Sequence, residues 1–430
     1  MAAAHYASEH NLEFQLFEGN SQLGGLCRTL EAHGFRFDTG AHRIHDTDGR
    51  VLDILGKYAP LNRVNASSRI VDGNRFIEFP LSLGGIMRSL GWTWMARAGI
   101  DLISQRLRPQ IAENFEAIAR HRYGGFLADR FLLNYSRKLW GIPCNQLSHA
   151  VAGPRLRGLD AKSLIQSIVG RRTASAEGAF YYPENGIGSL WPSMACSLGA
   201  HQFNTNHRVT KLLVEDSQIH SVQINGTLEY PVDQVISSLP MTSLVHLLDP
   251  PPPEDIIHAS RQLRFRDLVL VALFIEQPQV TPFATLYFPD PFIPFTRVFE
   301  PNNRCARMSP PGHTSLVIEN PCMFGDPTWL CEDGTIVEQT VQHLNDLNML
   351  NPRSVTGFHV VRLRKAYPVI DVYGTKHTAR CLQYLKSLKN MHVVGRNANF
   401  NYTSIHHQFQ GAQRAVLDLA HDRPKINRIA

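Results

Sequence analysis

The chain has 430 residues, which is long for one compact core, so two domains are expected. Its 43% apolar and 19% charged residues are typical of a soluble globular protein. The net charge of +6 includes no long block of Lys or Arg, which argues against a nucleic-acid partner and favours anionic small molecules.

The cysteines and histidines give no sign of a metal site. The seven cysteines are scattered without a Cys-x-x-Cys pair, and the adjacent pair His406-His407 has no zinc-type spacing around it. This pattern suits a reducing compartment, and with no secretory signal evident we expect a cytoplasmic protein. No apolar run approaches the ~20 residues of a membrane-spanning helix, so no transmembrane segment is expected.

The first predicted elements are a helix and a short buried strand. Residues Met1–His10 are rich in Ala, the best helix former. Phe14–Glu18 is an apolar run that ends in a carboxylate, and an acid at the end of a Rossmann strand can bind ribose hydroxyls. The Gly24-Gly25 doublet lets the backbone approach a ligand closely, and Arg28 is a candidate partner for two pyrophosphate oxygens.

A dinucleotide-binding unit carries a strand and a Gly-x-Gly-x-x-Gly loop before its first helix. The sequence shows neither ahead of the helix expected at Met1–His10. The ribose-binding acid lies about 20 residues beyond that loop, and Glu18 is placed as it would be for a loop just upstream of Met1. We therefore expect a nucleotide-binding domain that is truncated at its N-terminus.

The stretch Gly34-Phe35-Arg36-Phe37-Asp38-Thr39-Gly40-Ala41-His42 completes this N-terminal pattern. With Glu18 and Gly24–Thr29 it resembles the flavin-binding signature of the amine oxidase and protoporphyrinogen oxidase superfamily, nearest the branch that also resembles UDP-galactopyranose mutase. The resemblance implies FAD as cofactor, bound by Glu18, Gly24, Gly25, Arg28, Gly40, Ala41 and His42. It also implies that His42 lies near the flavin ring, where it would relay protons or hold the loop. The alternative without a ligand is a strand, a glycine turn and a hairpin.

Residues Leu81–Ala150 are predicted to form the helices of a cap. Among them, Gly91–Met95 carries two Trp residues and lies between Arg88 and Arg97. This segment is either a helix packed in the cap, which is the favoured interpretation, or an amphipathic helix at a membrane surface. Peripheral membrane contact therefore stays open. Farther on, Lys138–Cys144 is similar to a Val-Trp-Gly-x-Pro element of the family's substrate-facing domain.

Later segments resemble the family's return to the flavin domain. Tyr181–Trp191 contains the glycines of a tight turn before a helix. The family resemblance implies that Val209, in the strand that follows, lies beside the adenine, although a core strand residue would look the same. Asn225-Gly226 is a hairpin signal, and Leu268–Ile275 has the composition of a strand buried on both faces.

The C-terminal stretch resembles the closing motif of the family, a Gly-Arg-Asn turn, a Tyr-rich box and a final helix. His406 stands where the family has an acid. The residues that match this motif, and that the resemblance assigns to the cofactor, are Gly395, Arg396, Asn397, Tyr402 and His407.

These observations predict an α/β protein with a Rossmann-like FAD-binding domain and a second, α+β substrate or cap domain. The FAD-binding domain is expected to comprise residues 1–75, 185–245 and 358–430, and the cap residues 76–184 and 246–357. The predicted function is hydride transfer from an unidentified small-molecule substrate, anionic or a nucleotide sugar, to flavin. A mutase-like isomerase of a nucleotide sugar and a degenerate binding protein are the alternatives. The candidate catalytic residues are His42, Arg297 and Tyr367, with Arg364 as a further basic candidate.

Overall fold

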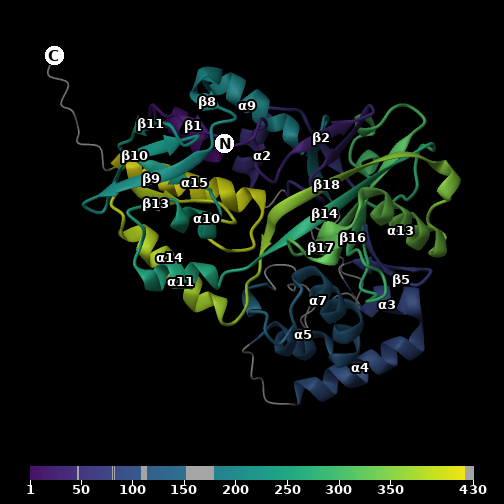
Figure 1. Cartoon of the computed structure of the whole chain (residues 1–430). Coiled ribbons are helices and arrows are strands. Elements are labelled where there is room, and N and C mark those ends of the chain that lie inside the picture. The colour runs from purple at the N-terminus through teal and green to yellow at the C-terminus, as the bar shows by residue number, and fades with distance from the viewer. Residues whose placement is uncertain (46–47, 80, 82, 108–113, 152–178, 422–430) are drawn as a thin grey trace.

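The computed structural model describes residues 1–45, 48–79, 81, 83–107, 114–151 and 179–421. Helices and strands alternate in a mixed α/β fold, as the sequence predicts (Figure 1). One half of the molecule carries short parallel strands with helices around them. The other half is built on a long twisted sheet, and a lobe of helices lies below it in Figure 1.

The first half contains two short parallel strand pairs. Strand β1 (Leu16–Phe17) pairs with β8 (Phe203–Asn204), and β12 (Val235–Ser237) pairs with β19 (Met391–Val393). Helix α1 (Ala2–Glu9) packs on the last helix, α15 (Ile405–His421), and α9 (Leu190–Gly199) joins them in one apolar cluster. The two ends of the chain and its middle therefore build this half together.

A four-stranded sheet in the same half has the order β11 (Leu228–Pro231), β10 (Gln218–Ile224), β9 (Val209–Glu215) and β13 (Leu248–Asp249). Asn225 and Gly226 have φ of 53° and 79°, the left-handed geometry that a two-residue hairpin turn requires, so the predicted hairpin is confirmed. Helices α10 (Met241–His246), α11 (Glu254–Arg261) and α14 (Gly374–Ser387) pack beside it through a shared apolar cluster.

The long sheet has seven strands, and its strand β14, next to the edge strand β18, is paired on both sides. Its order is β18 (Val355–Pro368), β14 (Phe265–Ile275), β17 (Thr314–Cys322), β16 (Arg297–Phe299), β15 (Thr285–Tyr287), β5 (Ser68–Asp72) and β6 (Arg75–Phe79). Every residue of β14 is buried, which confirms the predicted strand Leu268–Ile275.

Successive side chains of β14 belong to different cores, because a strand turns alternate side chains to opposite faces. Leu268, Leu270, Ala272 and Phe274 pack with the helical lobe. Val269, Val271, Leu273 and Ile275 pack with α13 (Asp333–Asp346). Because helices cover both faces of β14, its sequence is apolar from Leu268 to Ile275 without interruption.

The helical lobe confirms the helices predicted between Leu81 and Ala150, within the described residues. It consists of α3 (Leu83–Leu90), α4 (Trp92–Arg106), α5 (Phe115–Tyr123), α6 (Gly125–Leu127) and α7 (Asn134–Trp140), with a π-helical turn at Ala128–Leu133. The described residues include no helix with the length and apolarity needed to cross a membrane.

The remaining α-helices and β-strands lie between these elements in the sequence. They are α2 (Gly49–Gly56), the hairpin of β2 (Thr29–Ala32) and β3 (Phe35–Asp38), the pair β4 (Leu61–Val64) and β7 (Phe180–Pro183), and α12 (Pro327–Leu330). The expected domain boundaries stay a prediction. The structure adds that β5 and β18, which lie largely within the segments expected in the FAD-binding domain, hydrogen-bond into the seven-stranded sheet.

Candidate functional site

Glu18 follows directly after the parallel strand β1. Its Oε1 accepts hydrogen bonds from the backbone N–H and the side-chain amide of Asn20, at 2.8 and 2.7 Å. Its backbone N–H donates to the carbonyl of Asn204, and its own carbonyl accepts from the N–H of His207. The predicted ribose-binding carboxylate therefore lies at the carboxyl end of a parallel strand, held by the loop that follows it.

The two glycines of the doublet lie in different surroundings. A Cβ added at Gly24, where φ is +105°, would lie 2.2 Å from Cδ1 of Trp191, whereas at Gly25, where φ is +59°, it would meet nothing within 4 Å. The indole N–H of Trp191 donates to the carbonyl of Cys27 and so fixes the ring against the loop. Gly24 thus makes room for a side chain of α9, whereas the space that a Cβ at Gly25 would enter is open.

Arg28 is tied to the hairpin by its backbone. Its N–H donates to Oγ1 of Thr39 at 3.2 Å, and its carbonyl accepts from the N–H of Thr39 at 3.0 Å. The guanidinium Nε is buried and has no hydrogen-bond partner among the described residues. The backbone of Arg28 is therefore fixed by Thr39, while Nε of its side chain, which is predicted to bind pyrophosphate, has no partner among the described residues.

Asp38, within the segment Gly34–His42, links three segments of the chain through hydrogen bonds. Its fully buried carboxylate accepts from the hydroxyls of Thr29 and Tyr182, both at 2.6 Å, and from the N–H of Ile187 at 3.2 Å. Burial raises the pKa of this carboxyl group, against the opposing effect of those hydrogen bonds. Asp38 therefore joins the hairpin to β7 and to the turn before α9.

His42 lies in the turn after β3 with both ring nitrogens engaged. Nε2 is 2.9 Å from the carbonyl of Leu26, which only accepts, so Nε2 carries the hydrogen. Nδ1 faces the thiol of Cys27 at 3.8 Å. Burial, with Arg396 and Arg304 nearby, lowers the pKa of His42 to about 3. Of the two predicted roles, this arrangement favours holding the loop over relaying protons near neutral pH.

Three strands of the seven-stranded sheet, β16, β17 and β18, bring Arg297, Glu319 and Tyr367 together. Arg297 and Glu319 are register partners on β16 and β17, and Nε of Arg297 donates to Oε2 of Glu319 at 2.8 Å. Nη2 of Arg297 donates to the hydroxyl of Tyr367 at 3.0 Å. The other carboxylate oxygen of Glu319 accepts from the N–H of Ala41, in the turn Gly40–His42. Sequence reasoning missed Glu319, although an acid inside the apolar run of β17 was a usable signal.

The protonation states of this cluster follow from its burial. For Arg297, burial lowers the pKa, but the carboxylate of Glu319 outweighs it and the pKa lies well above the usual range. Burial, then the charge of Glu319, raises the pKa of Tyr367. Arg297 and Glu319 therefore form a buried ion pair whose charges cancel, next to a neutral phenol.

Aromatic rings continue the site toward the C-terminal motif. Trp140, Tyr367 and Tyr402 lie with ring centroids 5.5 to 6.2 Å apart. The guanidinium of Arg396 lies 5.4 Å from the centroid of Tyr367 and 5.7 Å from that of Tyr402, and Nη2 donates to the carbonyl of Ala366. These residues pack as an aromatic and cationic cluster, which we call the chamber wall: Trp140, Tyr367, Arg396 and Tyr402.

Comparison with known proteins decides the family. Residues 1–419 match the family of flavin containing amine oxidoreductases. The chain belongs to this family.

Solved structures with the same fold cover nearly the whole chain. Reduced UDP-galactopyranose mutase is 21% identical, with a TM-score of 0.86, over 97% of this chain and 93% of that one. A putative protoporphyrinogen oxidase from Exiguobacterium sp. 255-15 is 16% identical, with a TM-score of 0.76, over 98% and 96%. A triple mutant of putrescine oxidase is 15% identical, with a TM-score of 0.68, over 98% and 96%. At these identities the likeness shows the shared fold.

Members of this flavin amine oxidoreductase family bind FAD, and several buried polar atoms at the site suit such a ligand. Among the described residues, Nε of Arg28, Nε and Nη2 of Arg304, and Oδ1 of Asn397 have no hydrogen-bond partner. A buried polar atom left unpaired costs free energy, so a ligand that pairs with it is stabilised. Guanidinium donors suit phosphate oxygens, and the amide oxygen suits an N–H or hydroxyl donor.

Arg304 is the second functional candidate that sequence reasoning missed. It is 4% exposed, donates from Nη1 to the carbonyl of His42 at 2.9 Å, and lies 4.6 Å from the ring centroid of Phe299. Burial lowers the pKa of this guanidinium. A buried arginine without a carboxylate partner is unusual. Its place in an irregular turn after Pro301–Asn303 left no pattern from which to predict it.

The other residues of the closing motif hold the backbone around the site. Gly395 has φ of +96°, and the side-chain amide nitrogen of Asn397 donates to the carbonyl of Lys365 at 2.7 Å. Nδ1 of His407 accepts from the N–H of Ser404 at the start of α15, and its ring lies 4.0 Å from that of His406. In this structure His407 therefore fastens the start of the final helix.

Two predicted residues lie apart from the chamber wall. Val209 begins β9 and packs in the apolar cluster of that sheet, so its predicted adenine contact stays a prediction beside a core role. Arg364 is half exposed, pairs with Asp267 at 3.3 Å and lies over the ring of Phe324 at 3.7 Å. It borders a separate cavity of about 270 Å³.

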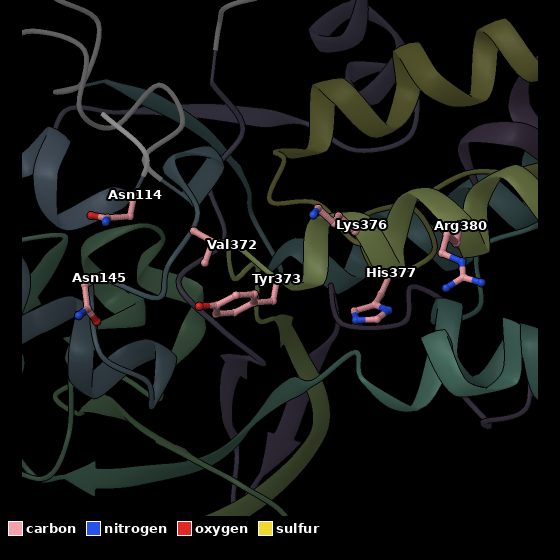
Figure 2. A pocket seen from close by; sticks show the side chains of 7 residues that line it. All are labelled: Asn114, Asn145, Val372, Tyr373, Lys376, His377 and Arg380. Carbon is pink, nitrogen blue, oxygen red and sulfur yellow. The ribbon is translucent and has the colours of Figure 1, made fainter. Parts of the chain in front are cut away.

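A larger cavity, of about 580 Å³, opens along α14 and is lined by residues outside the two flavin motifs. Figure 2 shows Tyr373, Lys376, His377 and Arg380 along this helix, with Asn114 and Asn145 opposite. Arg380 is paired with Asp255 on α11. Within the described residues no group of three or more His, Cys, Asp or Glu is placed to hold a metal ion.

Proposed function

We propose that the chain binds FAD between the Gly24–Arg28 loop, the Gly40–His42 turn and the Gly395–Asn397 turn. The unpaired buried atoms of Arg28, Arg304 and Asn397 support this proposal, as does the open space beside Gly25. Glu18 would bind ribose hydroxyls and Arg28 the pyrophosphate.

We propose that the bound FAD serves an oxidoreductase that acts on a small anionic substrate. FAD supplies two-electron redox chemistry, and the protein binds and orients the substrate. The observation that carries the choice of an anion is the charge of the site. Arg28, Arg304 and Arg396 have no ion-pair partner within the described part of the chain, whereas Arg297 is neutralised by Glu319. A protonated amine would be repelled by these guanidinium groups.

The residues of the chamber wall would act by position and by exclusion of water. Trp140 and Tyr402 would offer ring faces and edges to the substrate, and Arg396 would offer a positive charge beside Tyr367 and Tyr402. The ion pair Arg297–Glu319 fixes the hydroxyl of Tyr367, which can then accept from or donate to a substrate group. The neutral His42 keeps its proton on Nε2, bonded to Leu26, and so holds the turn beside the cofactor.

A flavin-dependent isomerase of a nucleotide sugar is the second candidate. The surplus of guanidinium groups favours it specifically, because a nucleotide sugar carries a pyrophosphate of its own. The likeness to UDP-galactopyranose mutase in fold makes UDP-galactopyranose the natural first probe.

One experiment separates these functions. The protein would be mixed without oxygen with candidate anionic substrates, and flavin absorbance and products recorded. Bleaching of oxidised flavin supports the oxidoreductase. Turnover of UDP-galactopyranose that requires prior reduction with dithionite, and leaves the flavin reduced, supports the isomerase. If the protein does not retain added FAD, both functions are refuted, and the remaining alternative is a binding protein without catalytic activity.

We also propose a cytoplasmic location. All seven cysteines are free, as a reducing compartment would keep them. Fractionation of cells into soluble, membrane and secreted material tests this proposal, and recovery of the protein from the secreted fraction would overturn it.

A further inference from the structure

Helix α4 carries an apolar stripe that faces away from the protein. Trp92, Ile100, Ile103 and Leu107, the residue after the helix, are 71%, 71%, 64% and 82% exposed. Ala96 is exposed as well, and the spacing of these five positions by three and four residues places them on one side of the helix. We call this surface the α4 stripe. In Figure 1, α4 forms the outer edge of the helical lobe, away from α14 and α15.

The opposite side of α4 packs against the helical lobe. Ala98 is buried, and Trp94 packs on Phe126 with ring centroids 5.1 Å apart. The carboxylate of Asp101 accepts from the N–H of Phe126 at 2.6 Å, so it is tied to the neighbouring helix. The sequence left a packed helix and a surface amphipathic helix as alternatives, and the structure shows a helix that packs with one side and exposes apolar residues on the other.

Among the described residues of α4, the exposed charged side chain is positive. Asp101 is the single acid within α4, and it is bonded inward. Arg97 is exposed beside the stripe, with its guanidinium 4.4 Å from the ring centroid of Phe126. The sequence of α4 ends in a further arginine, Arg106. The exposed side of the helix thus combines large apolar side chains with a cation at its border, and its exposed residues include no acid.

We propose that α4 docks in the plane of an anionic lipid surface. A helix of this kind lies at the interface with its apolar side between the headgroups, while its arginines meet lipid phosphates. Trp92, at the start of the helix, suits the headgroup region. The helix has 15 residues, about 22 Å at the usual rise, which is too short to cross a bilayer. A second copy of the chain would instead bring like charges together at the same face.

Vesicle sedimentation tests this proposal. The purified protein would be mixed with vesicles of phosphatidylcholine alone or with about one third phosphatidylglycerol, at a moderate salt concentration. The test variant is Ile100→Ser with Ile103→Ser, and the control is Leu228→Ser. Leu228 is an exposed leucine, 48% accessible, on β11 in the other half of the molecule. Melting temperatures confirm that each variant is folded.

The expected result is sedimentation of the wild type and the control with anionic vesicles, much weaker sedimentation with neutral ones, and at least ~10-fold weaker binding of the double variant. A wild type that stays in the supernatant with both vesicles overturns the proposal. So does a double variant that binds as well as the wild type. A wild type that is dimeric, becomes monomeric on substitution and ignores vesicles would show that the stripe joins two copies of the chain instead.

Discussion

Gly24 and Gly25 allow a matched test of how the glycine loop is built. In Gly24→Ala, the new methyl group would lie 2.2 Å from Cδ1 of the buried Trp191. The indole must then shift, at roughly 1–3 kcal/mol for overpacking. Its N–H would leave the carbonyl of Cys27, at a further 1–3 kcal/mol or so. In Gly25→Ala, the methyl meets nothing within 4 Å and the left-handed backbone alone costs about 1–2 kcal/mol.

The assay is guanidinium chloride unfolding of both variants without flavin, followed by tryptophan fluorescence. Gly24→Ala is expected to lower the unfolding midpoint clearly more than Gly25→Ala. Replacing Trp191 by Phe should cost less in the Gly24→Ala background than in the wild type, since the smaller ring relieves the clash. Equal midpoints for the two glycine variants, or strictly additive effects of Gly24→Ala and Trp191→Phe, would refute this account of the loop.

Three further predictions concern titratable groups of the site. Because the folded pKa of His42 is about 3 and the unfolded value is 6.5, acid favours the unfolded state. Between about pH 6 and 4.5 the wild type should therefore lose roughly 2 kcal/mol of unfolding free energy through His42, and His42→Gln should not show this part of the decrease. Denaturant midpoints measure it, and a variant with the pH profile of the wild type would contradict the prediction. Glu319→Gln should cost about 3–5 kcal/mol by leaving Arg297 uncompensated, and Arg297→Met should recover much of it in a double-mutant cycle. Glu18→Ala should weaken FAD binding ~10-fold or more in a titration, whereas Glu13→Ala should not, and equal losses would count against the ribose assignment.

The fold was predictable where the signal is local in the sequence. The left-handed pair Asn225-Gly226 needs only its own backbone preferences, and it forms the expected hairpin. The run Leu268–Ile275 lacks polar residues because helices cover both faces of β14, and that absence is visible in the sequence. The flavin motifs have fixed spacing within single segments, so they too are recognisable from the order of their residues.

The site was predictable only in part, because its partners come from distant segments. Arg297 was a candidate cation, but its neutralisation depends on the register of β16 against β17, which places it opposite Glu319. Gly24 suggested a close ligand, whereas its nearest neighbour is Trp191, far along the chain. Arg304 reaches the carbonyl of His42 from an irregular turn. Such pairings are set by tertiary packing, which periodicity and motif spacing do not encode.

The proposal of an anionic substrate rests on the charges of the site taken together. The ion pair of Arg297 with Glu319 contributes no net charge, and the carboxyl group of Asp38, whose pKa burial raises, accepts hydrogen bonds from Thr29, Tyr182 and Ile187. Arg28, Arg304 and Arg396 then remain as cations without an ion-pair partner among the described residues. A pyrophosphate at Arg28 would offset part of this charge, yet Arg396 lies over the rings of the chamber wall, where a substrate would bind. A cation at that place supports our proposal of an anionic substrate, so anionic small molecules should be tested before amines.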